Sequence, residues 1–155
     1  MKALELRIPP VAMTVLTGAA MWVTAESLPS LVIPLPPIWR AGIGVALAAA
    51  GIWFALAGVG DFRRASTTVN PLAPEATVQL VTDGVYRRTR NPMYLGMLLM
   101  LAGWAVALAH LTGPLFLLLF AMYITRFQIL PEERALQAQF GDEFSAYRRR
   151  VKRWF

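Results

Sequence analysis

One uncharged apolar run constrains the fold of this chain more than any other feature. No Asp, Glu, Lys or Arg occurs in the 20 consecutive residues from Ala41 to Gly60. A helix of about 20 apolar residues is long enough to cross the hydrocarbon core of a bilayer. Charged residues make up only 15% of the chain, against roughly 25% in an average soluble domain. The pattern is therefore typical of a membrane protein rather than of a water-soluble globule.

Three further apolar runs predict three more membrane spans. They cover residues 8–25, 93–109 and 114–130, and a short polar turn at 110–113 separates the last two. We therefore predict an all-α integral membrane protein, with one domain over residues 1–155 and four transmembrane helices. The first run has an alternative interpretation, because it ends in Val23-Thr24-Ala25 like a cleaved signal peptide. The three spans that follow favour the membrane helix.

The positions of the basic residues predict the orientation of this bundle. If both termini are cytoplasmic, 14 of the 15 Lys and Arg residues lie on the cytoplasmic side, and only Arg40 lies outside. The positive-inside rule favours that arrangement. It also accounts for the net charge of +6 without nucleic acid, which we do not expect as a partner. We expect the chain in the bacterial cytoplasmic (inner) membrane, with its functional face toward the cytoplasm.

Two cytoplasmic segments carry most of the polar residues. The first, 61–92, lacks a helical period, and we expect an ordered loop that ends where Asn91-Pro92 starts the third span. The second, 131–155, repeats apolar residues at spacings of 4, 4, 3 and 4, which predicts a C-terminal amphipathic helix. We expect this helix to lie in the membrane interface or over the cytoplasmic mouth, with its aromatic residues serving mainly as membrane anchors. The apolar positions are Leu136, Phe140, Phe144, Tyr147 and Val151.

Few groups suited to chemistry are available, and most of them fall at the cytoplasmic mouth. The chain has no Cys and one His, so we predict no metal site and no thiol nucleophile. Arg90 and Asn91 stand at the start of one span, and Arg126, Glu132 and Glu133 stand near the end of another. Mixed charges of this kind suit a zwitterionic or cationic polar ligand. The residues themselves do not identify that ligand.

Two motifs resemble the isoprenylcysteine carboxyl methyltransferase and phospholipid methyltransferase group of integral membrane enzymes. The first is GVYRRTRNPMYLG, and the second is PEERALQAQFGDEFSAYRRRVKRW, with a hydrophobic hairpin of fitting length between them. The two motifs cover about half of the chain and occur in the order found in that group. The matching positions are Gly84, Tyr86, Arg87, Arg90, Asn91, Pro92, Tyr94 and Gly96, then Glu132, Glu133, Leu136, Phe140, Gly141, Phe144 and Tyr147.

The resemblance implies methyl transfer from S-adenosyl-L-methionine, with S-adenosyl-L-homocysteine as product, to a lipophilic or membrane-embedded acceptor. It places the cofactor between the cytoplasmic ends of the last spans and the C-terminal segment. Arg90 and Glu133 are then the best candidates for residues essential to catalysis, and Tyr86 and Arg126 for contact with the substrate. The implied cofactor-binding residues are Arg90, Asn91, Pro92, Tyr94, Gly96, Glu132 and Glu133.

The class of acceptor stays open at this point. A carboxylate acceptor needs no general base, only alignment by Arg90 or Arg126, whereas an amine acceptor must lose a proton, for which Glu133 is the candidate base. The carboxyl methyltransferases typically have His where this chain has Asn91, and the phospholipid methyltransferases commonly show Asn-Pro-x-Tyr. A phospholipid-type N-methyltransferase is therefore the alternative, and a non-enzymatic membrane scaffold or lipid-binding protein is the second. Membrane lipid is an expected partner, and the sequence indicates no obligate protein partner.

Overall fold

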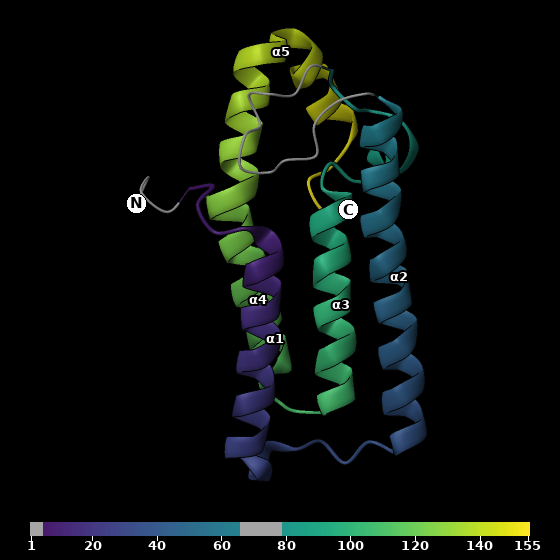
Figure 1. Ribbon diagram of the computed structural model, residues 1–155, viewed down its shortest axis with the longest axis vertical. Coiled ribbons are helices and arrows are strands. Elements are labelled where there is room, and N and C mark those ends of the chain that lie inside the picture. The colour runs from purple at the N-terminus through teal and green to yellow at the C-terminus, as the bar shows by residue number, and fades with distance from the viewer. Residues whose placement is uncertain (1–4, 66–78) are drawn as a thin grey trace.

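The computed structural model describes residues 5–65 and 79–155, and these residues form an elongated helical bundle (Figure 1). The only backbone bridge of strand type in this part of the chain joins Val32 and His110, so the expected all-α class is confirmed there. The helices are α1 (Pro10–Ser27), η2 (Pro29–Leu31), α2 (Pro37–Arg64), η4 (Gly84–Arg87), α3 (Pro92–Leu108), α4 (Gly113–Ile124), η5 (Thr125–Ile129) and α5 (Leu130–Arg150).

The four predicted runs all form helices, but two of the helices extend well beyond their apolar parts. α2 begins at Pro37 and continues to Arg64, because charged side chains at a solvated end do not interrupt helical hydrogen bonding. α4 continues through the π-helical turn η5 into α5 without a break. The apolar part of this long helix ends at Leu130, and the polar part that begins at Pro131 carries the candidate site.

Within the described residues, two helical segments are long and apolar enough to cross a membrane, by length and composition alone. They are Pro37–Arg64 and Gly113–Arg150, while α3 is apolar but shorter, with 17 residues. Only 17% of the most apolar window of Pro37–Arg64 is buried by protein. A core helix of a soluble protein would be mostly buried, so this exposure favours contact with lipid. Four spans and cytoplasmic termini stay predictions.

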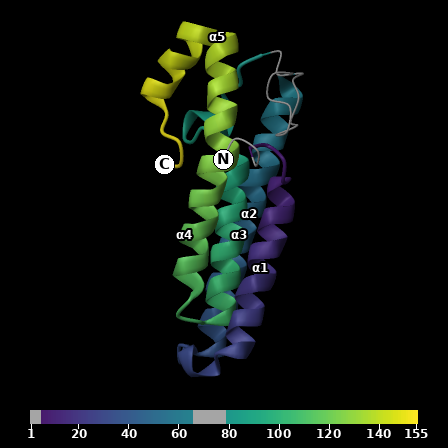
Figure 2. The same cartoon turned by 90° about the vertical axis from the view of Figure 1, so that its left-hand side faces the viewer.

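Glycines bring α2 and α3 into close contact. Gly44, Gly51 and Gly58 are buried at intervals of seven residues along α2, and they face α3. A Cβ atom added to Gly51 would lie under 3.0 Å from the backbone of α3, and one added to Gly96 would meet the backbone of α2 equally closely. Small residues of this kind let two apolar helices approach and pack through their backbones. α1 and α4 contact the remaining surface of α3, which lies centrally in the bundle (Figure 2).

The end of the bundle opposite the site is fixed by polar contacts to backbone carbonyls. Arg40 donates from both Nε and Nη2 to the carbonyl oxygen of Ala107, with a distance of 2.9 Å for Nε. A cation there satisfies a free carbonyl group in the last turn of α3 and complements the helix dipole. The buried His110 ring contacts Thr112 through Nδ1 and the Leu28 carbonyl oxygen through Nε2. These contacts give Arg40 and His110 structural roles.

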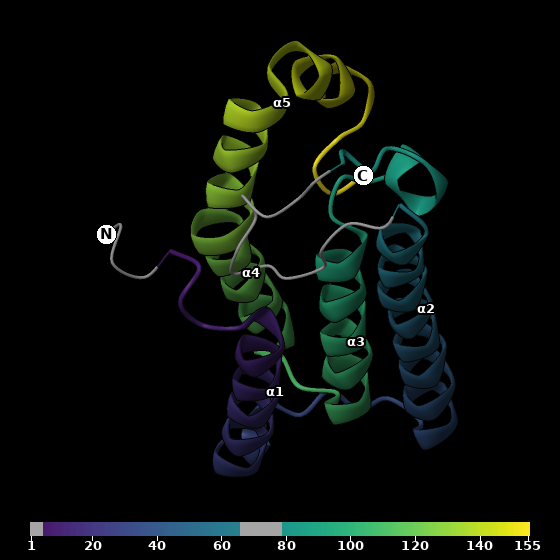
Figure 3. The same cartoon turned by 45° about the horizontal axis from the view of Figure 1, so that its top comes forward.

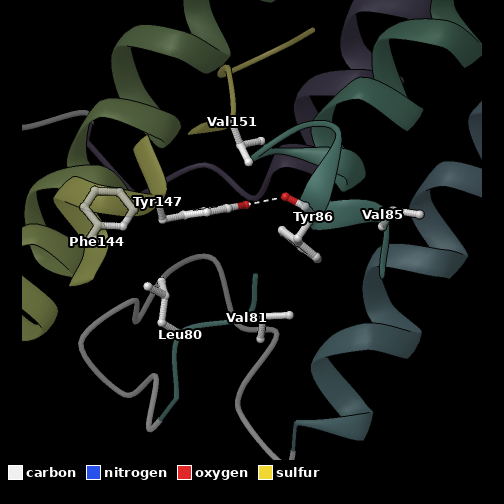
Figure 4. Close-up of a cluster of buried hydrophobic side chains, with 7 residues drawn as sticks. All are labelled: Leu80, Val81, Val85, Tyr86, Phe144, Tyr147 and Val151. Atoms are coloured by element: carbon white, nitrogen blue, oxygen red, sulfur yellow. Dashed lines mark hydrogen bonds between the residues drawn. The ribbon is translucent and has the colours of Figure 1, made fainter. Parts of the chain in front are cut away.

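The C-terminal helix bends back over the other end of the bundle (Figure 3). Gly141 has φ 49° and ψ −117° inside α5, a conformation that glycine adopts without strain. The bend brings Phe144 and Tyr147 into a buried cluster with the 80–86 segment, where Tyr147 Oη donates to the Tyr86 carbonyl oxygen at 2.8 Å (Figure 4). The apolar face of the bent part of α5 therefore packs against the 80–86 segment. Membrane anchoring does not account for these two aromatic residues, because protein covers them.

Candidate functional site

The segment after α5 is bound to the start of α3 by hydrogen bonds to its backbone. The Arg90 backbone N–H donates to the Lys152 carbonyl oxygen at 3.0 Å. The Asn91 side-chain amide and the Thr89 hydroxyl both donate to the Arg153 carbonyl oxygen, at 2.9 and 3.1 Å. Two motifs that are far apart in the sequence thus meet at one place. Arg90 and Asn91 each use a hydrogen-bond donor to bind the C-terminal segment.

Glu133 lies between two arginines at this junction. Its Oε1 accepts from Arg90 Nη2 at 2.7 Å, and its Oε2 accepts from Arg153 Nη2 at 2.7 Å. The Glu133 and Arg90 side chains are only 9% and 10% exposed. Burial raises the pKa of the Glu133 carboxyl, but hydrogen bonds and charge from Arg153 and Arg90 more than offset this effect, so the pKa falls below its ordinary value. Glu133 is therefore a carboxylate at neutral pH.

Glu132, the next residue, has the opposite electrostatic character. Tyr94 Oη, from the first turns of α3, donates a hydrogen bond to Glu132 Oε1. Burial raises the pKa of Glu132 to about 8, against the Tyr94 hydrogen bond, which lowers it, and the charge of Glu133 adds to the increase. Two adjacent carboxyls whose environments separate their pKa values resemble the acid and base pairs of enzyme active sites. At this position one carboxyl is charged while the other holds its proton near neutral pH.

A cavity of about 470 Å³ opens beside the Glu133 carboxylate. It lies between the first half of α5 and the residues at and beyond the C-terminal end of that helix. Three arginines and a single carboxylate supply its charged groups, so it suits a ligand that carries both an anionic and a cationic group. The lining residues are Leu130, Glu133, Arg134, Gln137, Ala138, Arg148 and Arg153.

The structure brings together five of the residues that the motifs single out: Arg90, Asn91, Tyr94, Glu132 and Glu133. Of these, Glu133 lines the cavity itself. Glu132 and Glu133 approach the start of α3 through Tyr94 and Arg90, as the combined motifs lead us to expect. Their roles in binding a cofactor stay predictions.

Two other motif residues are used for helix packing. Gly96 lies against α2, where an added Cβ would meet the Gly51 carbonyl oxygen, and Pro92 packs against Gly58. Both positions have a sufficient explanation in the contact between α2 and α3. Nothing in their surroundings adds support to the expectation that they bind cofactor.

The two residues expected to contact substrate lie outside this cluster of side chains. Tyr86 is 5% exposed in the core beneath α5, and its ring centroid lies 5.3 Å from that of Phe62. Arg126 pairs at 2.7 Å with Glu5, which also pairs with Arg134. Arg126 thus binds the N-terminal segment to η5, and no described contact joins it to Glu132.

Sequence reasoning missed Arg153, which provides one of the two cationic partners of Glu133 and lines the cavity. In the sequence it belongs to a basic C-terminal run, where every arginine looks like part of a positive-inside flank. The available signal was its position inside the second motif, after Tyr147. Among the described residues, no group of three His, Cys, Asp or Glu side chains is arranged to hold a metal ion.

Comparison with known proteins identifies the family. Residues 39–143, about two thirds of the chain, match the phospholipid methyltransferase family. The chain is also 35% identical over 75 residues to the protein-S-isoprenylcysteine O-methyltransferase of Schizosaccharomyces pombe, a match that covers 46% of this chain but only 30% of that protein. An uncharacterised protein of Haemophilus influenzae is 40% identical over 62 residues, which cover 40% of this chain and 98% of that protein. No solved structure matches.

The family match covers more than half of the chain, so this protein belongs to the phospholipid methyltransferase family. The resemblance inferred from the two motifs is thereby confirmed at the level of the family. Membership supports membrane methyltransferase activity, and it suggests lipid or lipophilic substrates and association with a membrane.

Proposed function

We propose that this protein transfers a methyl group from S-adenosyl-L-methionine to a lipophilic or membrane-embedded acceptor. The observation that carries the proposal is the Glu133 carboxylate, held by Arg90 and Arg153 at the edge of a cavity of about 470 Å³. This site is built from the two motifs that connect the chain to a family of methyltransferases. It lies at one end of an apolar bundle, where a water-soluble cofactor and a lipophilic acceptor can meet.

The charged groups of the cavity fit the chemical groups of that cofactor. S-adenosyl-L-methionine supplies a methyl group on a sulfonium cation, and it also carries a carboxylate and an ammonium group. Arg148, which lines the cavity, suits the carboxylate, and Glu133 suits the ammonium group or a ribose hydroxyl. Methyl transfer is a direct displacement, so the residues contribute chiefly by orienting the reactants and excluding water.

The two glutamates differ in their suitability for proton transfer to an amine acceptor. Glu133 is stabilised as a carboxylate by two arginines, and its lowered pKa makes it a weak base. Burial raises the pKa of Glu132 to about 8, and a pKa near the working pH suits a group that exchanges protons. By pKa alone, Glu132 suits the role of base in an N-methyltransferase better than Glu133, whereas Glu133 is the glutamate that lines the cavity. A carboxylate acceptor would need neither glutamate as a base.

Calorimetric titration of the purified protein in detergent with S-adenosyl-L-homocysteine tests the proposal. We expect saturable binding, which Glu133→Gln weakens at least about tenfold, or 1.4 kcal/mol. Glu143→Gln provides the matched control, because Glu143 is an exposed carboxylate on the same helix. Wild-type protein that takes up no ligand at millimolar concentration would overturn the proposal. The protein can then be incubated with methyl-labelled S-adenosyl-L-methionine and lipid extracts. A labelled methyl ester would identify a carboxylate acceptor, and a labelled methylamine would identify an amine acceptor.

A further inference from the structure

A buried aspartate lies at the end of α2, outside the two family motifs. Asp61 is 7% exposed and is the only charged residue among the buried positions of α2. Its Oδ2 accepts a hydrogen bond from the Val85 backbone N–H at 2.9 Å, and its Oδ1 accepts one from Arg64. Arg64 is largely exposed, with 76% of its side chain accessible. Oδ2 of Asp61 thus binds the backbone of the η4 turn, while Oδ1 binds the exposed Arg64.

The turn is shaped to accept this carboxylate. Gly84 has φ +59°, and a Cβ atom added there would overlap both oxygens of the Asp61 side chain. A side chain at Gly84 would therefore be strained by its backbone conformation and would displace the carboxylate as well. The glycine that opens the first motif is explained by its contact with Asp61, a residue that lies 23 positions earlier in the chain.

The η4 turn leads directly into the candidate site. Val85 and Tyr86 are buried, and the Tyr86 carbonyl oxygen accepts the hydrogen bond from Tyr147 on the bent part of α5. A few residues later, Arg90 reaches Glu133. The segment from Gly84 to Arg90 is therefore anchored by α2 at its start and by Glu133 and the C-terminal segment at its end.

We propose that Asp61 is a positioning residue for the methyltransferase site. Its carboxylate fixes the backbone of η4 and so sets where the following Arg90 meets Glu133. Asp61 makes no described contact with Glu133, so it acts through the turn. The effect on ligand binding rests on the proposed function, whereas the effect on the turn does not.

Four variants separate this role from a general effect on folding. Asp61→Ala removes both acceptors, and Gly84→Ala disturbs the same contact from the opposite side. Asp61→Asn keeps an oxygen for the Val85 N–H but loses the charge, and Arg64→Ala removes only the exposed partner. We expect the first two variants to weaken binding of S-adenosyl-L-homocysteine about tenfold. The last two should bind within about twofold of wild type, because the hydrogen bond to the turn remains.

Hydrogen exchange of the 84–90 segment provides the readout that does not depend on a ligand. Exchange should accelerate in Asp61→Ala and return toward the wild-type rate in Asp61→Asn. If wild-type protein binds no S-adenosyl-L-homocysteine, the proposed function fails, but this exchange pattern still supports the anchoring of the turn. Folded Asp61→Ala protein with wild-type affinity would overturn the positioning role. Asp61→Asn that behaves like Asp61→Ala in both measurements would overturn the hydrogen bond as its cause.

Discussion

Glu132 and Glu133 are adjacent in the chain, yet their surroundings give them different charges. Glu133 contacts two guanidinium groups, and Glu132 contacts the hydroxyl of Tyr94. Opposite charge lowers the pKa of a carboxyl, while burial without a cationic partner raises it. The stability of the protein should therefore depend on pH in two separate ranges, one for each glutamate.

Glu133→Gln should destabilise the protein most at neutral pH. The variant leaves Arg90 and Arg153 without a counter-charge. We expect the free energy of unfolding to fall by roughly 2–3 kcal/mol. This is slightly below the usual cost of breaking a fully buried pair, because Arg153 is 30% exposed. The native pKa of Glu133 is lowered, so its stabilising effect is complete above the ordinary pKa of about 4.3 and is lost as the pH falls through the native value. Thermal unfolding in detergent from neutral to acid pH measures this. A gap between the variant and wild type that stays constant into acid would contradict the role of the ion pairs.

Glu132→Gln should change stability in a higher pH range and in the opposite direction. The native pKa is raised to about 8, whereas the unfolded chain releases this proton near pH 4.3. Wild-type stability should therefore fall as the pH rises between these two values, and the neutral amide of the variant removes that fall. We expect the variant to gain at least about 1 kcal/mol relative to wild type between pH 5 and pH 8. Parallel unfolding profiles for the two proteins would contradict the raised pKa.

At the scale of elements, glycines let α2 and α3 pack closely against each other. Gly51 and Gly96 lie where the two backbones meet, and an added Cβ at either position would overlap main-chain atoms that cannot turn aside. Gly42 is also in α2, but a Cβ there would meet nothing within 4 Å. Replacing each of these glycines by alanine thus distinguishes the effect of helix packing on stability from the effect of helix propensity.

Gly51→Ala and Gly96→Ala should each destabilise the protein by about 1–3 kcal/mol, the usual cost of overpacking. Gly42→Ala should be neutral or stabilising by up to about 1 kcal/mol, because alanine favours a helix more than glycine does. Unfolding midpoints measured in one detergent compare the three variants directly. Equal effects at all three glycines would show that packing between α2 and α3 is not the cause.

At the scale of the whole molecule, the sequence predicts the helices better than the site. Uncharged runs bounded by prolines and polar turns predict the helix ends to within a few residues where the residues that end the helix are close in sequence. The start of α3 at Pro92 is an example. The roles of Asp61, Gly96 and Arg153 depend on contacts between distant parts of the chain, which no local pattern encodes. Arg126 illustrates the same limit, because its partner Glu5 lies 121 positions away.

The orientation of the whole molecule is open to a direct test, because the chain has no cysteine and a single introduced thiol reports on one position. Ser30 lies in the short helix at one end of the bundle, and Asp142 lies past the bend of α5 at the other end, and both are exposed (Figure 1). The positive-inside rule predicts that Ser30→Cys faces outward and Asp142→Cys faces the cytoplasm.

A membrane-impermeant maleimide should therefore label Ser30→Cys in bacterial spheroplasts that express the protein, and it should label Asp142→Cys only after the membrane is permeabilised. Wild-type protein should stay unlabelled in both conditions. Labelling of both thiols in intact spheroplasts would mean that the chain does not place these two ends on opposite sides of the membrane. Labelling of Asp142→Cys alone would mean that the bundle is inverted, with the site of Arg90 and Glu133 outside, where the cytoplasmic supply of S-adenosyl-L-methionine does not reach it.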